Sequence, residues 1–425
     1  MMLDRSIAPS VQEIKDYSLP TAEVIQLSNN VRIHYLENAT QPVVRLEIVF
    51  PAGKWYEPEK GVSYFTSKLL LEGTSKKSAK QIADILDFYG ASLECNQGFD
   101  WATLTLYCLS KFYKDLFPLV QEILSEAALP EHELELLKKR TIQNIGVERK
   151  KPAYLAMERF TQKVYGLDHP YVSGLQETDI QAVSLGSIKD FFSRSYLLSG
   201  TEIFLCGDIK PEIKQLTEAY FGAHENPKNV SHEAKLSHAL NPDTNLGDVK
   251  VPGSLQAAIR VGKIFPVINS SDYLPLTLVN RILGGYFGSR LMKNIREDKG
   301  FTYGIYSSLS VRKYSTLFFI GTDVIGSAAE ETVSEIFKEI ERLKNELVPE
   351  QELATVKNYM IGKFLSETNN IFDQTDRYKH IVLHELPQDH YQLYLQTIRK
   401  STSEEIRDLT RKYFTEDLVT TIAGA

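Results

Sequence analysis

The spacing of apolar positions divides the chain into two successive series of strands and helices. Short apolar runs predict strands in the first half over 43–50, 101–109 and 202–206. The 3.6-residue spacing typical of helices, seen for example at Ile82, Leu86 and Tyr89, recurs over 79–89, 112–128, 130–150, 154–165 and 187–196. In the second half we expect strands over 257–261, 304–309, 315–320 and 419–423. Helices are expected there over 273–283, 289–299, 328–347, 349–367, 373–384 and 404–414.

The two series have the same order of elements and the same spacing. Gly73 follows an apolar run, and Gly285 closes a similar run 212 positions later. A polar stretch rich in Asn, His, Ser and Asp separates the two copies. We therefore predict an N-terminal domain over 1–223, a linker over 224–250 and a C-terminal domain over 251–425.

The order of elements within each copy indicates the fold class. Some neighbouring strands have no helix between them, which favours antiparallel pairing. The prediction is an α+β fold with antiparallel or mixed sheets packed with helices. The sequence contains no GxGxxG or GxxxxGK[ST] motif, so the common nucleotide-binding signatures are absent.

Composition narrows the class of protein further. A chain of 425 residues exceeds the ~250–300 residues at which single cores stop growing, as expected for two domains. The net charge of −7 argues against a nucleic-acid partner. No apolar run reaches the ~20 residues of a membrane span, and the first residues lack a secretory signal, so we expect a cytoplasmic protein. The three cysteines form no CxxC pair, which argues against a cysteine-based zinc site.

One segment, residues 61–74, has the frame of a metal-binding helix but lacks the ligands. It reads Gly-Val-Ser-Tyr-Phe-Thr-Ser-Lys-Leu-Leu-Leu-Glu-Gly-Thr. It resembles the zinc-binding helix of the pitrilysin/insulinase family of metallopeptidases, Gly-x-x-His-x-x-Glu-His followed by an apolar run and Gly-Thr. The two His positions hold Tyr64 and Lys68, and the position of the general base holds Ser67. The position of the third ligand, a Glu in the family, holds Asn144. The resemblance thus implies a degenerate zinc site with no bound metal.

A second segment keeps the family pattern. Residues 289–304 resemble the family's Ser-Arg-Leu…Arg-Glu-x-x-Gly-Leu-x-Tyr segment. In the family, its Arg and Tyr contact the peptide at a zinc site on a facing domain, and here they are Arg296 and Tyr303. A guanidinium and a phenolic hydroxyl suit a peptide carbonyl and its developing oxyanion. The expected position of Arg296 is late on a helix, with Tyr303 at the start of the next strand.

The resemblance implies two homologous α/β-roll domains and a division of labour like that of mitochondrial processing peptidase. Such a chain is a non-catalytic subunit, inactive alone, of a heterodimeric zinc endopeptidase. Its expected partner is a paralogous subunit of similar length that carries the zinc, and its expected substrate is an unfolded peptide. Without that partner the same surfaces would allow a homodimer.

Other interpretations stay open. The chain is alternatively an inert scaffold or peptide-binding protein with no peptidase partner. A metal site at His380 and His384, four positions apart, is less favoured because no third ligand can be named. The glycine-rich loop 284–288 either contacts substrate or simply ends a helix at Gly285.

Overall fold

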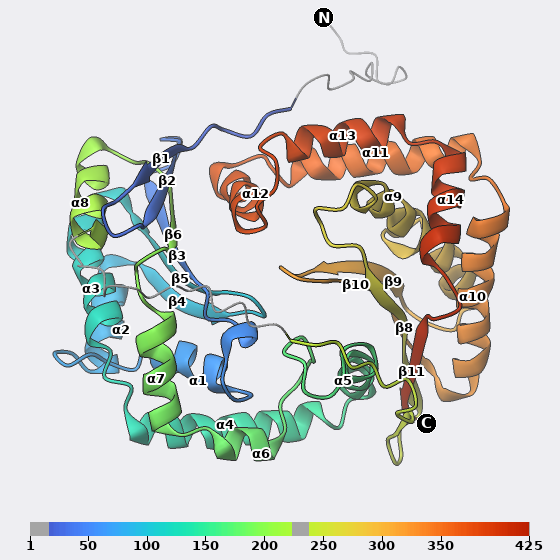
Figure 1. Ribbon diagram of the computed structural model, residues 1–425, viewed down its shortest axis with the longest axis horizontal. Coiled ribbons are helices and arrows are strands. Elements are labelled where there is room, and N and C mark those ends of the chain that lie inside the picture. The colour runs from blue at the N-terminus through green and yellow to red at the C-terminus, as the bar shows by residue number, and fades with distance from the viewer. Residues whose placement is uncertain (1–16, 223–237, 425) are drawn as a thin grey trace, which may run out of the picture.

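The computed structural model describes residues 17–222 and 238–424, which form two β-sheets with helices packed around them (Figure 1). The first sheet has the strand order β1-β2-β6-β3-β5-β4. Its strands are β1 (Glu23–Gln26), β2 (Arg32–Glu37), β3 (Val43–Phe50), β4 (Ser92–Gln97), β5 (Ala102–Leu109) and β6 (Glu202–Gly207). The second sheet has the order β7-β11-β8-β10-β9. Its strands are β7 (Val249–Lys250), β8 (Gln256–Phe265), β9 (Ile305–Val311), β10 (Thr316–Ile325) and β11 (Val419–Gly424).

The helices follow the same two series. Those of the first half are α1 (Val62–Leu69), α2 (Ala79–Tyr89), α3 (Tyr113–Glu126), α4 (Glu131–Glu148), α5 (Pro152–Tyr165), α6 (Glu177–Ala182), α7 (Leu185–Ser195) and α8 (Pro211–Gly222). Those of the second half are α9 (Tyr273–Gly284), α10 (Ala329–Asn345), α11 (Glu350–Ser366), α12 (Ile371–Leu383), α13 (His390–Lys400) and α14 (Ser403–Tyr413). Three short 3₁₀ helices are η1 (Lys54–Tyr56), η2 (Ser110–Phe112) and η4 (Gly326–Ala328), and η3 (Met292–Asp298) is a π-helix.

The two sheets repeat one topology. The order β6-β3-β5-β4 in the first sheet corresponds to β11-β8-β10-β9 in the second. These central strands pair antiparallel, whereas β2 with β6 and β7 with β11 pair parallel. Each sheet packs its own apolar side chains into a large core, one around Ile48 and Leu104 and the other around Ile259 and Phe318. The predicted α+β class with mixed sheets is confirmed.

Each half contributes one helix to the sheet of the other half. Helix α5 packs on β8 and β11, and α12 packs on β6 and β2 (Figure 1). Small side chains allow α5 to lie close to the second sheet, because Ala156 of α5 packs against Ala258 of β8 and Ala423 of β11. Neither sheet is therefore covered by its own segment alone, which joins the two halves into one packed unit.

A buried arginine on the central strand of each sheet binds the incoming helix. Arg45 of β3 donates its Nη2 to the carbonyl of Phe372, the second residue of α12 (3.0 Å). Arg260 of β8 donates its Nη2 to the carbonyl of Ala153, the second residue of α5 (3.4 Å). Both arginines are at most 6 % exposed. The exchanged helices are thus held by the same kind of contact in both copies.

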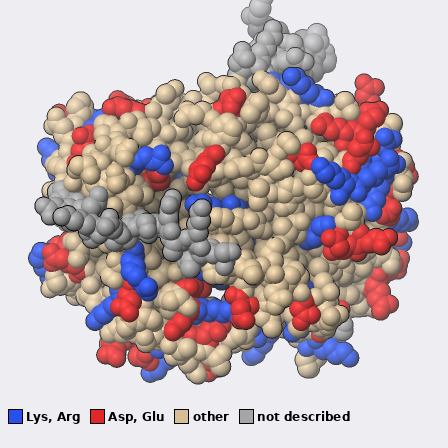
Figure 2. Space-filling view, in the orientation of Figure 1, with Lys and Arg blue, Asp and Glu red and all other residues tan. Residues whose placement is uncertain are grey.

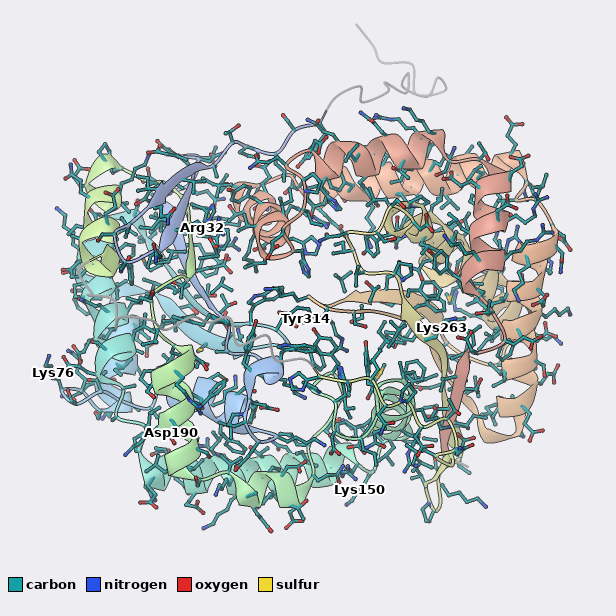
Figure 3. All side chains as sticks on the ribbon, in the orientation of Figure 1. Arg32, Lys76, Lys150, Asp190, Lys263 and Tyr314 are labelled. Atoms are coloured by element: carbon teal, nitrogen blue, oxygen red, sulfur yellow. The ribbon has the colours of Figure 1, made fainter. Side chains whose placement is uncertain are left out.

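The β4–β5 and β9–β10 turns meet between the halves. The Asp100 carboxylate accepts the hydroxyl of Tyr171 (2.5 Å) and the main-chain N–H of Lys313 (3.0 Å). Beside them the ring of Tyr314 stacks on Trp55, with centroids 4.3 Å apart. Figure 3 shows Tyr314 near the centre of the molecule, between the two sheets. Asp100, Tyr171 and Trp55 are buried in this junction, whereas Tyr314 is 46 % exposed at its edge.

Several elements differ from the sequence-based expectations. The segment expected to be an α-helix over 289–299 is largely a π-helix, η3. Strands β1, β2, β4 and β7 and helices α6, α8 and α13 were not predicted. Of the predicted linker 224–250, residues through 237 lie outside the described residues. Within 17–222 and 238–424, no helix is both long and apolar enough to cross a membrane.

Candidate functional site

Helix α1 carries three of the four positions that correspond to the family's zinc site. Its N-terminus is capped by the Glu57 carboxylate, which accepts the main-chain N–H groups of Gly61 and Ser63 (3.2 Å each) and the Ser63 hydroxyl (2.6 Å). Burial raises the pKa of Glu57 despite these hydrogen bonds. The helix is therefore fixed at its start, as a metal-binding helix would need to be.

The side chains on α1 cannot replace the ligands they stand for. Ser67 is 1 % exposed, and its hydroxyl donates to the main-chain carbonyl of Tyr64 (2.8 Å). The half-buried Tyr64 ring packs edge-on against Phe65, with centroids 5.3 Å apart. Lys68 is exposed, and an ammonium group has no lone pair for a metal. No residue here supplies a general base or a good zinc ligand.

The fourth position, Asn144, lies on α4, which packs against α1. The side chain of Asn144 is exposed and carries no charge at neutral pH. Across the described part of the chain, no three His, Cys, Asp or Glu side chains gather closely enough to hold a metal ion. The structure keeps the helix pair of a zinc site, but its side chains do not fit zinc.

Arg296 lies on the π-helix η3, which begins directly after Leu291. The N–H of Lys299 donates to the carbonyl of Asn294 (3.0 Å), the wide turn that defines this helix. The Arg296 guanidinium lies over the Phe287 ring, 4.6 Å from its centroid. Arg296 itself is half-buried, and Phe287 is 65 % exposed. The guanidinium is thus held at the surface by an aromatic platform.

Tyr303 lies in the connection between η3 and β9, two residues before the strand begins. Its side chain is 99 % exposed. The turn beneath it is fixed by Thr302, whose hydroxyl donates to the carbonyl of Asp323 (2.8 Å). Tyr303 and Arg296 lie on either side of Gly300, whose φ of 69° favours glycine. The structure does not bring the two side chains into contact, and it leaves the tyrosine free for a ligand.

The loop 284–288 follows α9 and presents Phe287 to Arg296. Helix α9 ends at Gly284, and the N–H of Gly285 closes its last turn onto the carbonyl of Arg281 (3.2 Å). A Cβ on Gly284 would lie 2.8 Å from the main-chain nitrogen of Ser307 on β9. The helix-ending role predicted for Gly285 therefore agrees with the structure. The contact of Phe287 with Arg296 was not predicted, although an aromatic side chain within a glycine-rich loop was an available signal.

His380 and His384 lie on or just after α12, with ring centroids 4.4 Å apart. Burial lowers the pKa of His380 to about 3 and that of His384 to about 4. His384 packs edge-on against Trp101, with centroids 5.2 Å apart. Both imidazoles are neutral at physiological pH, and His384 packs between His380 and Trp101, which favours a structural role for the pair.

Over most of the face in Figure 2 acidic and basic side chains are interspersed, and the group of basic side chains at its right edge is flanked by acidic ones. This mixed pattern lends no support to long-range steering of a highly charged ligand to this face.

The comparisons with known proteins identify the family. A model described as "Insulinase (Peptidase family M16)" matches residues 32–170. A model described as "Peptidase M16 inactive domain" matches residues 182–360. The chain therefore belongs to the insulinase (M16) family of peptidases and contains two consecutive segments of that family.

Its relatives have similar lengths. A Bacillus subtilis protein described as an uncharacterized zinc protease, YmxG, is 23 % identical over 92 % of this chain and 95 % of its own. A Helicobacter pylori protein described as a non-peptidase homolog, YmxG, is 23 % identical over 90 % of this chain and 89 % of its own. The solved structure of a Pseudomonas fluorescens peptidase M16 inactive domain covers 95 % of this chain and 98 % of its own, with 22 % identity and a TM-score of 0.82. A protease from Helicobacter pylori covers 96 % of this chain and 100 % of its own, with 18 % identity and a TM-score of 0.84.

Proposed function

We propose that this chain is a non-catalytic subunit of a heterodimeric zinc metalloendopeptidase. The observation that carries the proposal is the contrast between two regions. The side chains at the positions of the zinc site supply neither good zinc ligands nor a general base; these are Tyr64, Ser67, Lys68 and Asn144. By contrast, Arg296 and Tyr303 are held at the surface. A relative described as a non-peptidase homolog agrees with an inactive chain. Zinc would then be carried by a paralogous partner subunit.

In this proposal Arg296 and Tyr303 act on a peptide bound between the subunits. The Phe287 ring orients the Arg296 guanidinium and leaves its N–H groups to donate to a peptide carbonyl. The Tyr303 hydroxyl supplies one further donor, which would stabilise negative charge developing on that oxygen. Such donors contribute only when a partner supplies the nucleophile, so the isolated chain should not hydrolyse peptides.

The experiment begins with affinity purification of the chain from its native source and identification of what binds to it. The expected result is a chain of similar length with a His-x-x-Glu-His motif. Mixed with that partner, the wild-type chain should raise hydrolysis of a fluorogenic unfolded peptide. Arg296→Ala and Tyr303→Phe should each lower kcat by about 100-fold or more while the complex still forms.

Matched controls lie beside both residues. Lys293→Ala removes an exposed cation on the same π-helix, and Tyr306→Phe removes a hydroxyl from a tyrosine on β9 that is 46 % exposed. Neither should change kcat more than about twofold. Equal rates with and without the chain, or controls as damaging as Arg296→Ala, would refute the proposal.

The alternative function is a peptide-binding or scaffold protein of the same fold with no peptidase partner. The surface exposure of Tyr303 and Phe287 is compatible with either role. Peptide binding by the isolated chain, with no zinc-bearing chain recovered in the purification, would favour the alternative.

A further inference from the structure

A cavity of about 360 Å³ lies within the second half, outside the site described above. Its walls come from α9, β9, α11, α12 and α13, and residues that line it include Thr277, Ser308, Met360 and Tyr394. The volume falls in the range typical of small-ligand pockets, about 300–1,000 Å³. The cavity can therefore hold a small molecule or the end of a peptide.

The charges that line the cavity are unbalanced. Arg281, Lys363 and Arg377 line it, and Glu367 is the only acid among the described lining residues. That carboxylate accepts a hydrogen bond from Arg377 (2.9 Å) and lies 3.6 Å from the ammonium of Lys363. One acid thus faces three permanent cations, which leaves an excess of positive charge beside a partly enclosed space. Placing an anion there would offset that charge.

His380 and His390 also line the cavity but add no charge. Burial, the neighbouring His384 and His390, and Arg377 lower the pKa of His380 to about 3, and burial lowers the pKa of His390. Both imidazoles are therefore neutral near pH 7. The positive charge of the cavity comes from the arginines and the lysine.

Buried polar atoms along the wall lack hydrogen-bond partners. Asn280 and Tyr391 are 9 % and 6 % exposed, and both line the cavity. The Oδ1 atom of Asn280 and the Nε of Arg281 are buried without a hydrogen-bond partner among the described residues, whereas the Tyr391 hydroxyl lies beside Arg377. Buried polar groups are usually satisfied, so two unpaired atoms on residues that line one cavity point to a missing ligand. The Arg281 Nε can donate, and the Asn280 oxygen can only accept.

We propose that this cavity binds a small carboxylate that carries an adjacent N–H donor. The carboxylate pairs with the Arg281 and Arg377 guanidinium groups, because a planar fork of donors matches two carboxylate oxygens. The adjacent N–H donates to the Oδ1 of Asn280, which satisfies the unpaired acceptor on the wall. A free amino acid and the C-terminal residue of a peptide share this chemistry. The inference does not depend on the proposed pairing with a peptidase subunit.

The test is isothermal titration of the full-length chain with four probes: alanine, trialanine, trialanine amide and inorganic phosphate. Trialanine should bind, and its amide should bind at least about tenfold more weakly, because the amide loses the charge-assisted hydrogen bonds. Alanine that binds as tightly as trialanine identifies a free amino acid as the source. Alanine that binds much more weakly identifies a peptide C-terminus.

Two variants remove the site by different routes. Arg281→Gln removes a cation, and Ser308→Phe fills the cavity from β9 without changing its charge. Each should weaken trialanine binding at least about tenfold, and the fold of each is checked by circular dichroism. Arg140→Gln, an exposed position on α4, is the matched control and should bind as the wild type does. Absence of carboxylate binding, binding of phosphate alone, or unchanged binding in a folded Ser308→Phe variant would overturn the proposal.

Discussion

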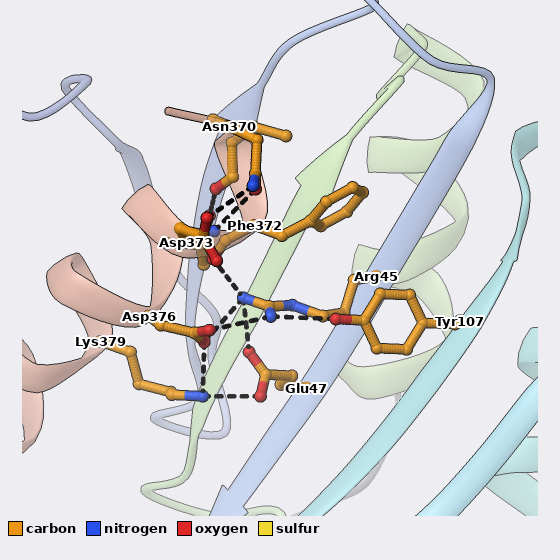
Figure 4. Close-up of polar contacts among 10 residues, drawn as sticks. Arg45, Glu47, Tyr107, Asn370, Phe372, Asp373, Asp376 and Lys379 are labelled. Carbon is orange, nitrogen blue, oxygen red and sulfur yellow. Dashed lines mark hydrogen bonds and ion pairs between the residues drawn. The ribbon is translucent and has the colours of Figure 1, made fainter. Parts of the chain in front are cut away.

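The ion pairs between β3 and α12 give a quantitative test of how the two halves are joined (Figure 4). Arg45 lies 2.9 Å from the Asp376 carboxylate and 3.1 Å from that of Glu47. Lys379 bonds the other oxygen of Glu47 (2.6 Å) and also Asp376 (3.1 Å). Because β3 belongs to the first half and α12 to the second, these contacts connect segments more than 300 positions apart.

The perturbation is Arg45→Met, which keeps much of the apolar stem and removes the charge. Glu47 is 4 % exposed, so the loss leaves a buried carboxylate with Lys379 as its remaining cation. The carbonyl of Phe372 loses its donor as well. Breaking a buried pair by removing one partner costs about 3–5 kcal/mol. We expect the free energy of unfolding to fall by that amount.

Urea unfolding followed by tryptophan fluorescence and circular dichroism measures this loss. Trp101 packs against His384 at the end of α12, so its emission reports on the docking of that helix. Arg32→Met is the control, because its side chain is 50 % exposed and its pair with Glu202 should contribute about 1 kcal/mol or less. A loss below about 1 kcal/mol for Arg45→Met, or a loss equal to that of the control, would refute the reasoning.

Three further predictions concern packing and pH. Gly284→Ala should lower the free energy of unfolding by about 1–3 kcal/mol, because its Cβ would lie 2.8 Å from the main chain of β9. Gly146→Ala, within α4 and with nothing within 4 Å, should raise it by about 0.5–1 kcal/mol; urea midpoints that move in the opposite directions would contradict both. Protonation of His384 should lower the free energy of unfolding of the wild type by about 2 kcal/mol between pH 7 and pH 5. The His384→Phe variant should not show this part of the loss. The pKa of His384 is lowered to about 4 in the folded chain, so the unfolded chain takes up the proton first, and stability falls as pH drops below about 6.5. An unchanged pH dependence of the urea midpoint in the variant would show that His384 is not the group responsible.

The sequence predicted elements whose pattern is set locally. The strand over 43–50 and the helix over 79–89 have the predicted bounds, because each combines clear apolar spacing with a defined end. Strand β4 was missed because it is an edge strand in which only Cys95 is buried. Strand β2 was missed because its buried run includes His34, a polar residue satisfied by Tyr378 from α12. Such strands depend on partners that the local sequence does not reveal.

In the candidate site, too, features set by the local sequence were predicted, and features that depend on distant segments were not. The frame of 61–74 was sufficient to place three of the four degenerate positions on one helix, as found in α1. The π-helix that carries Arg296 was expected to be an α-helix, because a single wide turn leaves no distinct apolar period in a short segment. The cavity beside Arg281 was not anticipated, because its walls come from five elements and no short motif contains them.

The exchange of α5 and α12 bears on how a peptide could reach the space between the subunits of the proposed heterodimer. Opening the two halves like a hinge would expose the buried Arg45 and Glu47 and would separate the buried Asp100 carboxylate from the main-chain N–H of Lys313. Uncovering several buried charge contacts at once costs far more than the few kcal/mol available to a ligand-driven motion. The halves of this chain should therefore move as one body. In the proposed heterodimer, access for substrate would then come from separation of the two subunits rather than from bending within this one.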